Sequence, residues 1–271
     1  MQAFNTLKLT HFAPTIAFLT GVPAPTDGEQ EVYKPLVSLC DEKTGKSHVE
    51  KILVYNPDAI GQFFFEKYKE KIFSPLAERA QMQVPFLTAF PSKTPVCFAT
   101  MFSGADPSVH GINRYEKPVL KVDTLFDEWA KAGKKVALIS KGGQSIPKIF
   151  ANRPIDYYIT NGDKESVDKA IELLQTSDYD VIEVYNQEYD DKLHITYPIS
   201  LSCKRAAKHY VESYVRLYDA VKTYWKDYSS LLTFSPDHGA HRIGKVFIGT
   251  HGKNVPSDMN ILHFFTFFGR V

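Results

Sequence analysis

The sequence has few cysteines, no long apolar run and almost no net charge. Its three cysteines, Cys40, Cys97 and Cys203, lie far apart and form no CxxC pair, which argues against a disulfide framework or a structural zinc knot and favours a reducing compartment. No apolar run approaches the roughly 18 residues that cross a bilayer. The first residues also lack the basic and apolar regions of a secretion signal. We therefore expect a cytoplasmic protein that is not held in a membrane.

The composition is otherwise that of an ordinary globular protein. Hydrophobic residues make up 44% of the chain and charged residues 23%. A formal net charge of +1 gives no electrostatic reason to expect a nucleic-acid polymer as a partner. Because the sequence shows no internal repeat or long linker, we expect residues 1–271 to form a single domain.

Apolar, strand-like runs alternate with amphipathic segments along most of the chain. Strands are predicted at 51–56, 135–140, 155–160, 180–186, 229–235 and 245–250, and helices at 60–80, 124–134, 164–177 and 204–228. The polar segment 25–50 is expected to be a loop with a short hairpin. The alternation predicts an α/β fold with a mainly parallel sheet and helices on both faces. In such sheets ligands bind at the carboxyl ends of the strands.

Aspartate and histidine side chains follow four of these predicted strands. They are Asp58, Asp190, His194, Asp237, His238 and His251. Each residue taken alone is an ordinary turn former or solvated side chain, but together they would meet at one edge of the sheet. A set of aspartates and histidines without cysteine suits Zn²⁺, which we expect, or Mn²⁺ as the alternative. Six such ligands are enough for two ions that share a substrate oxygen during phosphoryl transfer.

The segment SKTPVCFATMFSGADPSVHGI, at 92–112, resembles the nucleophile segment of the alkaline phosphatase superfamily, in its branch of type I phosphodiesterases and nucleotide pyrophosphatases. In that branch a threonine opens a short loop and a helix, a glycine follows ten residues on, and His-Gly-Ile comes next. Thr94, Gly104 and the tripeptide at 110–112 keep this spacing, and the aspartates and histidines follow in the family's order. The resemblance implies an alkaline phosphatase-like α/β core.

The resemblance also implies a role for each side chain. One ion would be held by Asp190, His194 and His251. The other would be held by Asp58, Asp237 and His238, with the Thr94 hydroxyl facing it. Thr94 would attack phosphorus in line and form a phospho-threonine intermediate, because a bound dication favours the alkoxide of an otherwise weak nucleophile.

Three features depart from the family's pattern, and the choice of one ligand stays open. Ala59 follows the first aspartate, where a glycine is common. Asn113, expected to contact the substrate, follows the His-Gly-Ile tripeptide at once, out of register with the family's asparagine. Asp191 is the alternative to Asp190 as a ligand, because the two are adjacent. Finally, HFAPTIAFLTGVPAP, at 11–25, resembles a helix that usually follows the last histidine, so we expect it to pack beside the C-terminal strand.

We therefore predict a two-metal hydrolase of small phosphorylated substrates, of the phosphodiester or nucleotide pyrophosphate type. The alternatives are a metal-dependent phosphomutase or phosphonate hydrolase, a metal-binding protein without activity, and a structural α/β protein without metal. Because the chain is short for the superfamily, large substrate-selecting insertions are expected to be missing, apart from a small one within 110–180.

Overall fold

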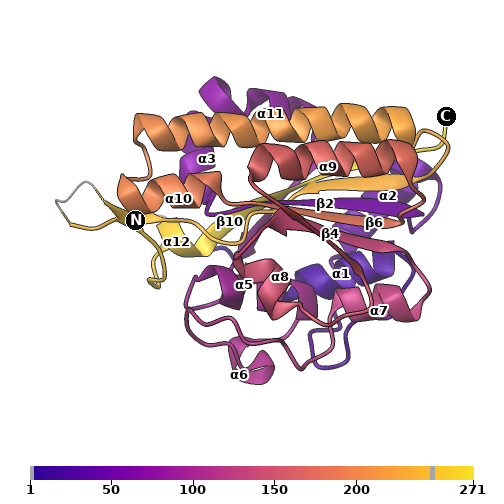
Figure 1. The fold of residues 1–271 in the computed structure, drawn as a ribbon, viewed down its shortest axis with the longest axis horizontal. Helices are drawn as coiled ribbons and strands as arrows, with labels where there is room; N and C mark the ends of the chain where they lie inside the picture. Colours follow the sequence, from indigo (N-terminus) through magenta and orange to yellow (C-terminus); the bar gives the residue numbers. More distant parts are fainter. Residues whose placement is uncertain (1–2, 245–247) are drawn as a thin grey trace.

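A sheet of eight strands organises the protein, whose residues 3–244 and 248–271 are described in a computed structural model (Figure 1). The strand order is β1-β3-β10-β7-β2-β6-β4-β5. The strands are β1 (Leu7–Lys8), β2 (Lys51–Pro57), β3 (Met82–Leu87), β4 (Val136–Lys141), β5 (Asp156–Thr160), β6 (Val181–Asn186), β7 (Ser230–Phe234) and β10 (Asn260–Phe268).

The central strands of this sheet are parallel. Strands β7, β2, β6, β4 and β5 run in one direction, whereas β10 is antiparallel to both of its neighbours, β7 and β3. The prediction of an α/β fold with a mainly parallel sheet is confirmed. Because β7, β2 and β6 are adjacent and parallel, the loops that follow them leave from the same edge of the sheet.

Helices cover both faces of the sheet (Figure 1). On one face lie α1 (Phe12–Leu19), α5 (Thr94–Ser103), α7 (Leu125–Lys131) and α8 (Ser145–Ile149), and on the other lie α3 (Gln62–Tyr68), α9 (Asp163–Thr176), α10 (Glu188–Ile195) and α11 (Leu201–Tyr224). Alternate residues of β2 fill the two cores: Val54 belongs to the core under α5, and Leu53 and Tyr55 belong to the core under α11. A strand buried on both faces reads as a continuous apolar run, which is why the sequence predicts it well.

The first helix lies beside the last strand. Strand β1 pairs in parallel with β3, which in turn pairs with β10. The ring of Phe12, at the start of α1, meets the ring of His263 in β10 edge to face, with centroids 5.4 Å apart. The prediction that the N-terminal segment packs beside the C-terminal strand is confirmed.

Several predicted elements differ from those observed. The strand predicted at 245–250 is described only in part, because 245–247 lie outside the described residues. Within 248–250, β9 (Gly249–Thr250) pairs with β8 (His241–Arg242) in a separate two-stranded sheet. The segment 25–50 contains α2 (Lys34–Thr44) in place of a hairpin, and Gly45 ends that helix in the left-handed conformation, with φ of 71°. The helix predicted at 60–80 is divided into α3, a π-helical turn η2 (Lys69–Phe73) and α4 (Ser74–Arg79).

The remaining short elements are η1 (Leu9–His11), α6 (Pro107–His110) and α12 (Pro256–Met259). Most of the range 110–180 belongs to the core, since it supplies β4, β5 and α7 to α9, and a small insertion within it stays a prediction. No helix in the described part of the chain is long and apolar enough to cross a membrane.

Candidate metal centre

The six predicted aspartates and histidines come together in two groups. Asp190, His194 and His251 form one group, called here the Asp190 group. Asp58, Asp237 and His238 form the other, called the Asp58 group. In each group the atoms able to bind a metal ion lie within 4.8 Å of one another.

Neighbouring strand ends bring most of these side chains to one place. Asp58 directly follows β2, and Asp237 and His238 follow β7. Helix α10, which begins just after β6, carries Asp190 and His194 one turn apart on the same face. His251 arrives by a different route: it lies in the loop after β9, outside the main sheet. The expectation that all four predicted strands would belong to one sheet is therefore wrong for the strand before His251.

The three side chains of the Asp190 group converge on a single point. Nε2 of His194 and Nε2 of His251 lie 3.4 and 3.5 Å from Oδ1 of Asp190. The two Nε2 atoms are 3.2 Å apart. Asp190 and His251 are buried, whereas His194 is exposed, so this group is the one nearer to solvent.

The Asp58 group is fully enclosed. All three of its residues have 0% exposure, and Nε2 of His238 lies 3.5 Å from Oδ1 of Asp58 and 3.3 Å from Oδ2 of Asp237. The rings of His238 and His251 stack with centroids 4.0 Å apart and planes inclined by 16°. The two groups are therefore in direct contact through one histidine ring of each.

Backbone carbonyl groups fix the orientation of these two histidine rings. Nδ1 of His251 donates to the carbonyl oxygen of Ser92 at 2.6 Å, and Nδ1 of His238 donates to the carbonyl oxygen of Gly239 at 3.0 Å. With the proton on Nδ1, the lone pair of each Nε2 points toward the carboxylates. Metal-binding histidines are held in this way in proteins, with the second ring nitrogen bonded to a carbonyl or carboxylate.

The carboxylates of both groups have oxygens that lack partners. Within the described residues, Oδ1 of Asp58, Oδ1 of Asp190 and Oδ2 of Asp237 are buried without a hydrogen-bond donor. A buried carboxylate oxygen without a donor or cation costs folding free energy. A divalent cation in each group would remove that cost, so the donor set fits two metal ions.

The protonation of these groups follows from their burial. Burial raises the pKa of Asp58 well above its usual range, with the charge of Asp237 adding to the rise, and burial raises the pKa of Asp237 to about 7. Burial lowers the pKa of His251 to about 4 and, together with the charge of His251, lowers the pKa of His238. The imidazoles of His238 and His251 are therefore neutral at physiological pH, which is the form that binds metal ions, whereas the hydrogen bond to Asp190 raises the pKa of His194. A cation would favour the ionised carboxylates and the neutral imidazoles.

Thr94 lies at the first position of α5 and faces the Asp58 group. Its side chain is buried, with Oγ1 3.4 Å from Oδ2 of Asp58 and 3.3 Å from Nε2 of His238. Pro95 suits the first turn of the helix, where no amide donor is needed. Helix α5 ends ten residues later at Gly104 with φ of 71°, so the threonine-to-glycine spacing of the motif is the length of this helix.

Two supporting contacts of the Asp58 group are absent from the sequence predictions. The hydroxyl of Tyr185, on β6, donates to Oδ2 of Asp58. The backbone N–H of Ala59 donates to Oδ1 of Asp237 at 3.1 Å, and Ala59 adopts a left-handed φ of 66° to do so. A glycine takes this conformation without strain, which accounts physically for the glycine common at this position in the family.

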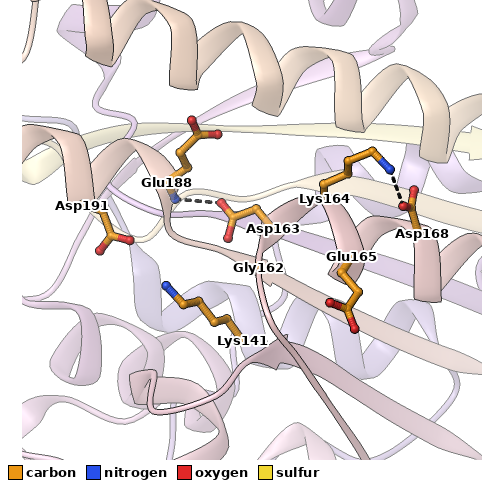
Figure 2. A pocket seen from close by; sticks show the side chains of 8 residues that line it. All are labelled: Lys141, Gly162, Asp163, Lys164, Glu165, Asp168, Glu188 and Asp191. Carbon is orange, nitrogen blue, oxygen red and sulfur yellow. Dashed lines mark hydrogen bonds and ion pairs between the residues drawn. The ribbon is translucent and has the colours of Figure 1, made fainter.

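Neither Asp191 nor Asn113 belongs to the two groups. Asp191 is exposed and lines a cavity of about 460 Å³. In Figure 2 the ammonium group of Lys141 points across this cavity toward it. Asn113 is exposed in the loop after α6. Nearby, Nε2 of His110 contacts Oγ1 of Thr100 at 3.0 Å, about 9 Å along α5 from its first residue. His110 therefore attaches α6 to α5.

Comparison with protein-family models and with curated proteins gave no match. Among solved structures, human ectonucleotide pyrophosphatase/phosphodiesterase 5 is similar, with a TM-score of 0.60 and 14% identity over 81% of this chain and 88% of that chain. An inactive form of the murine protein in complex with AMP has a TM-score of 0.58 and 18% identity, and the match covers 72% of this chain and 59% of that chain. Phosphonoacetate hydrolase from Sinorhizobium meliloti, in complex with phosphonoacetate, has a TM-score of 0.53 and 14% identity, and the match covers 72% of this chain and 58% of that chain.

These similarities define the class of fold. The protein shares the α/β fold of these solved structures, so the expected alkaline phosphatase-like core is confirmed. The similar structures belong to the nucleotide pyrophosphatase and phosphodiesterase branch of that superfamily.

Proposed function

We propose that this protein is a two-metal hydrolase of phosphoric esters, with Thr94 as its nucleophile. The observation that carries the proposal is the arrangement of two adjacent Asp/His groups, which are in contact through the stacked rings of His238 and His251, with a threonine hydroxyl at one of them. Phosphodiesters or nucleotide pyrophosphates are the proposed substrates, because the Thr94 segment resembles that branch. The AMP bound in the murine structure supports this choice.

Each group is proposed to bind one metal ion. Asp190, His194 and His251 would hold one ion, and Asp58, Asp237 and His238 the other. Bound divalent ions would stabilise the negative charge of the reacting phosphoryl group and favour the ionised nucleophile. Zn²⁺ is the proposed metal and Mn²⁺ the alternative, because both accept imidazole and carboxylate ligands.

The chain positions Thr94 for attack. In the structure its hydroxyl donates to Oδ2 of Asp58, and the helix that it begins presents its amino-terminal end to the same space. That end of a helix favours phosphoryl oxygens through free N–H groups and the helix dipole. Attack by Oγ1 forms a Thr94–phosphoryl ester as the bond from phosphorus to the leaving oxygen breaks, and the proton lost by the hydroxyl is taken up by the leaving alcohol or phosphate. Water then cleaves this ester, which regenerates the hydroxyl and releases the phosphorylated product.

The exposed side of the centre is the proposed entrance for substrate. His194 is exposed, whereas the other proposed ligands and Thr94 are buried. Asn113, which is exposed in the loop after α6, is proposed to contact the substrate. A cytoplasmic location stays a prediction based on cysteine usage. The three cysteines, which are free and buried, support it.

The experiment is a substrate panel tested with wild type and Thr94→Ala. Aryl monoesters, aryl diesters, dinucleotide pyrophosphates and phosphonoacetate would each be supplied with Zn²⁺ or Mn²⁺. We expect diester or pyrophosphate hydrolysis by wild type and a loss of roughly a thousandfold or more in Thr94→Ala, with bound metal retained. Thr100→Ala is the matched control, since it removes another buried hydroxyl of α5 that bonds His110.

The panel also separates the alternatives. Preferred cleavage of phosphonoacetate would support a phosphonate hydrolase, a reaction carried out by one of the similar proteins. Transfer of the phosphoryl group within a substrate, without release of phosphate, would support a phosphomutase. Metal binding without turnover of any compound would support a metal-binding protein.

A further inference from the structure

A histidine–aspartate pair, in which the aspartate is buried and the histidine partly buried, joins the loops that carry the two ligand groups. His241 lies three residues after His238, and its Nδ1 is 2.8 and 2.9 Å from the two carboxylate oxygens of Asp258. Asp258 belongs to α12 and has 0% exposure. The pair therefore connects the end of the 237–241 loop to the segment that follows His251.

Asp258 also organises the segment that carries His251. Its Oδ2 accepts a hydrogen bond from the backbone N–H of Lys253 at 3.0 Å, two residues after His251. Its backbone carbonyl oxygen accepts from the N–H of Gly239 at 2.8 Å, directly after His238. A displacement of Asp258 would therefore reach one histidine of each group.

The backbones of the loops that follow β2 and β7 pack closely against each other and against the segment before β10. A Cβ atom added at Gly239 would lie 2.1 Å from the carbonyl oxygen of Ser257. One added at Gly61, three residues after Asp58, would lie 2.8 Å from the Cα of Gly239. Regions packed this tightly transmit a displacement and do not absorb it. The loops after β2 and β7 and the segment before β10 thus meet beside Asp258.

We propose that His241 is a positioning residue that holds the two ligand groups in register through Asp258. The inference rests on the proposed metal centre. His241 follows the Asp58 group in sequence, and its partner Asp258 is bonded to the loops of both groups. The loss of the His241 side chain should therefore weaken the binding of both ions. Removal of a group that orients metal ligands typically lowers metal affinity 10–100-fold.

The test compares wild type with His241→Ala and His241→Asn. The amide nitrogen of asparagine stands near the place of histidine Nδ1, so it can still donate to Asp258. His48→Ala, which removes an exposed histidine, is the control. Zn²⁺ stoichiometry and dissociation constants would be measured by competition with a chromophoric chelator. Circular dichroism would give the unfolding midpoint of each metal-free protein.

We expect His241→Ala to bind both Zn²⁺ ions about 10–100-fold more weakly, with His241→Asn and His48→Ala close to wild type. A purely structural role would lower the metal-free midpoint of His241→Ala without this loss of affinity, and that result would overturn the inference. An equal loss of affinity in His241→Asn would also overturn it. If the alanine variant does not fold, His241→Gln, whose amide nitrogen lies one bond further out, replaces it with the same expectation.

Two other outcomes have distinct meanings. Nε2 of His241 has no hydrogen-bond partner among the described residues. A third Zn²⁺ that binds wild type and is lost in His241→Ala would therefore make His241 a ligand and overturn the positioning role. A wild type that binds no Zn²⁺ would refute the proposed metal centre, and with it the inference.

Discussion

Glu183 is a buried carboxylic acid that the proposed reaction does not use. It lies in β6 opposite Val54 of β2 and Leu138 of β4, with 0% exposure. Neither of its carboxylate oxygens has a hydrogen-bond partner among the described residues. Burial raises its pKa well above the usual range. We predict that Glu183→Met, which keeps the length of the side chain and removes its polar atoms, stabilises the protein.

The size and pH dependence of this effect follow from the structure. An unsatisfied buried polar group costs about 1–3 kcal/mol, so Glu183→Met should raise the free energy of unfolding by that amount at pH 8. Because the pKa of Glu183 is raised in the folded state, the protein is most stable with respect to this group below its unfolded pKa of about 4.3. Stability is then lost as pH rises from that value toward the folded pKa. The gain from the substitution should therefore be smaller at pH 5 than at pH 8.

Urea unfolding at both pH values, with a chelator present to exclude metal linkage, would measure this effect. Glu183→Gln removes the ionisation and keeps a polar group, so it should exceed wild type in stability by more at pH 8 than at pH 5. Glu70→Gln, at an exposed position, is the control and should change little. A Glu183→Met protein that is less stable than wild type at pH 8 would refute the reasoning, because the carboxylate would then have a stabilising partner.

Three further predictions concern the Asp58 group. Tyr185→Phe removes the hydroxyl that bonds Asp58 and should weaken metal binding about 10–100-fold without unfolding the protein; equal Zn²⁺ affinity by chelator competition would contradict this. Ala59→Gly relieves a left-handed φ of 66° and should raise the free energy of unfolding by up to about 1 kcal/mol, whereas a loss in urea unfolding would show that the methyl group is needed for packing. Gly239→Ala places a methyl group against Ser257 and should cost about 1–3 kcal/mol of stability along with Zn²⁺ affinity; a stable variant with wild-type affinity would mean that the loops can separate.

The convergence of five of the six side chains could be predicted because of where they stand in the sequence. Asp58, Asp190 and Asp237 follow strands that read as buried, and parallel neighbours deliver such residues to one edge. The position of His251 could not be derived in this way. Its approach depends on the loop after β9 and on its bond to Ser92, which is distant in sequence.

The unpredicted elements have physical reasons. Strand β10, NILHFFTFF, is buried on both faces, and periodicity alone does not distinguish a short apolar run of this kind from a buried helix segment. The bond from Tyr185 to Asp58 joins residues 127 positions apart, and an aromatic residue in an apolar strand looks like any other core residue. The same applies to Asp258, whose role depends on contacts with His241 and Lys253 that no local pattern indicates.

The central claim is that two bound metal ions and Thr94 together hydrolyse a phosphoric ester. The most direct measurement adds Zn²⁺ stepwise to metal-free protein and follows bound metal per chain together with hydrolysis of the best substrate from the panel. We predict that hydrolysis rises as the second ion binds, and that Thr94→Ala binds two ions yet stays inactive. Hydrolysis that persists without metal, or that survives in Thr94→Ala with two ions bound, would contradict the claim.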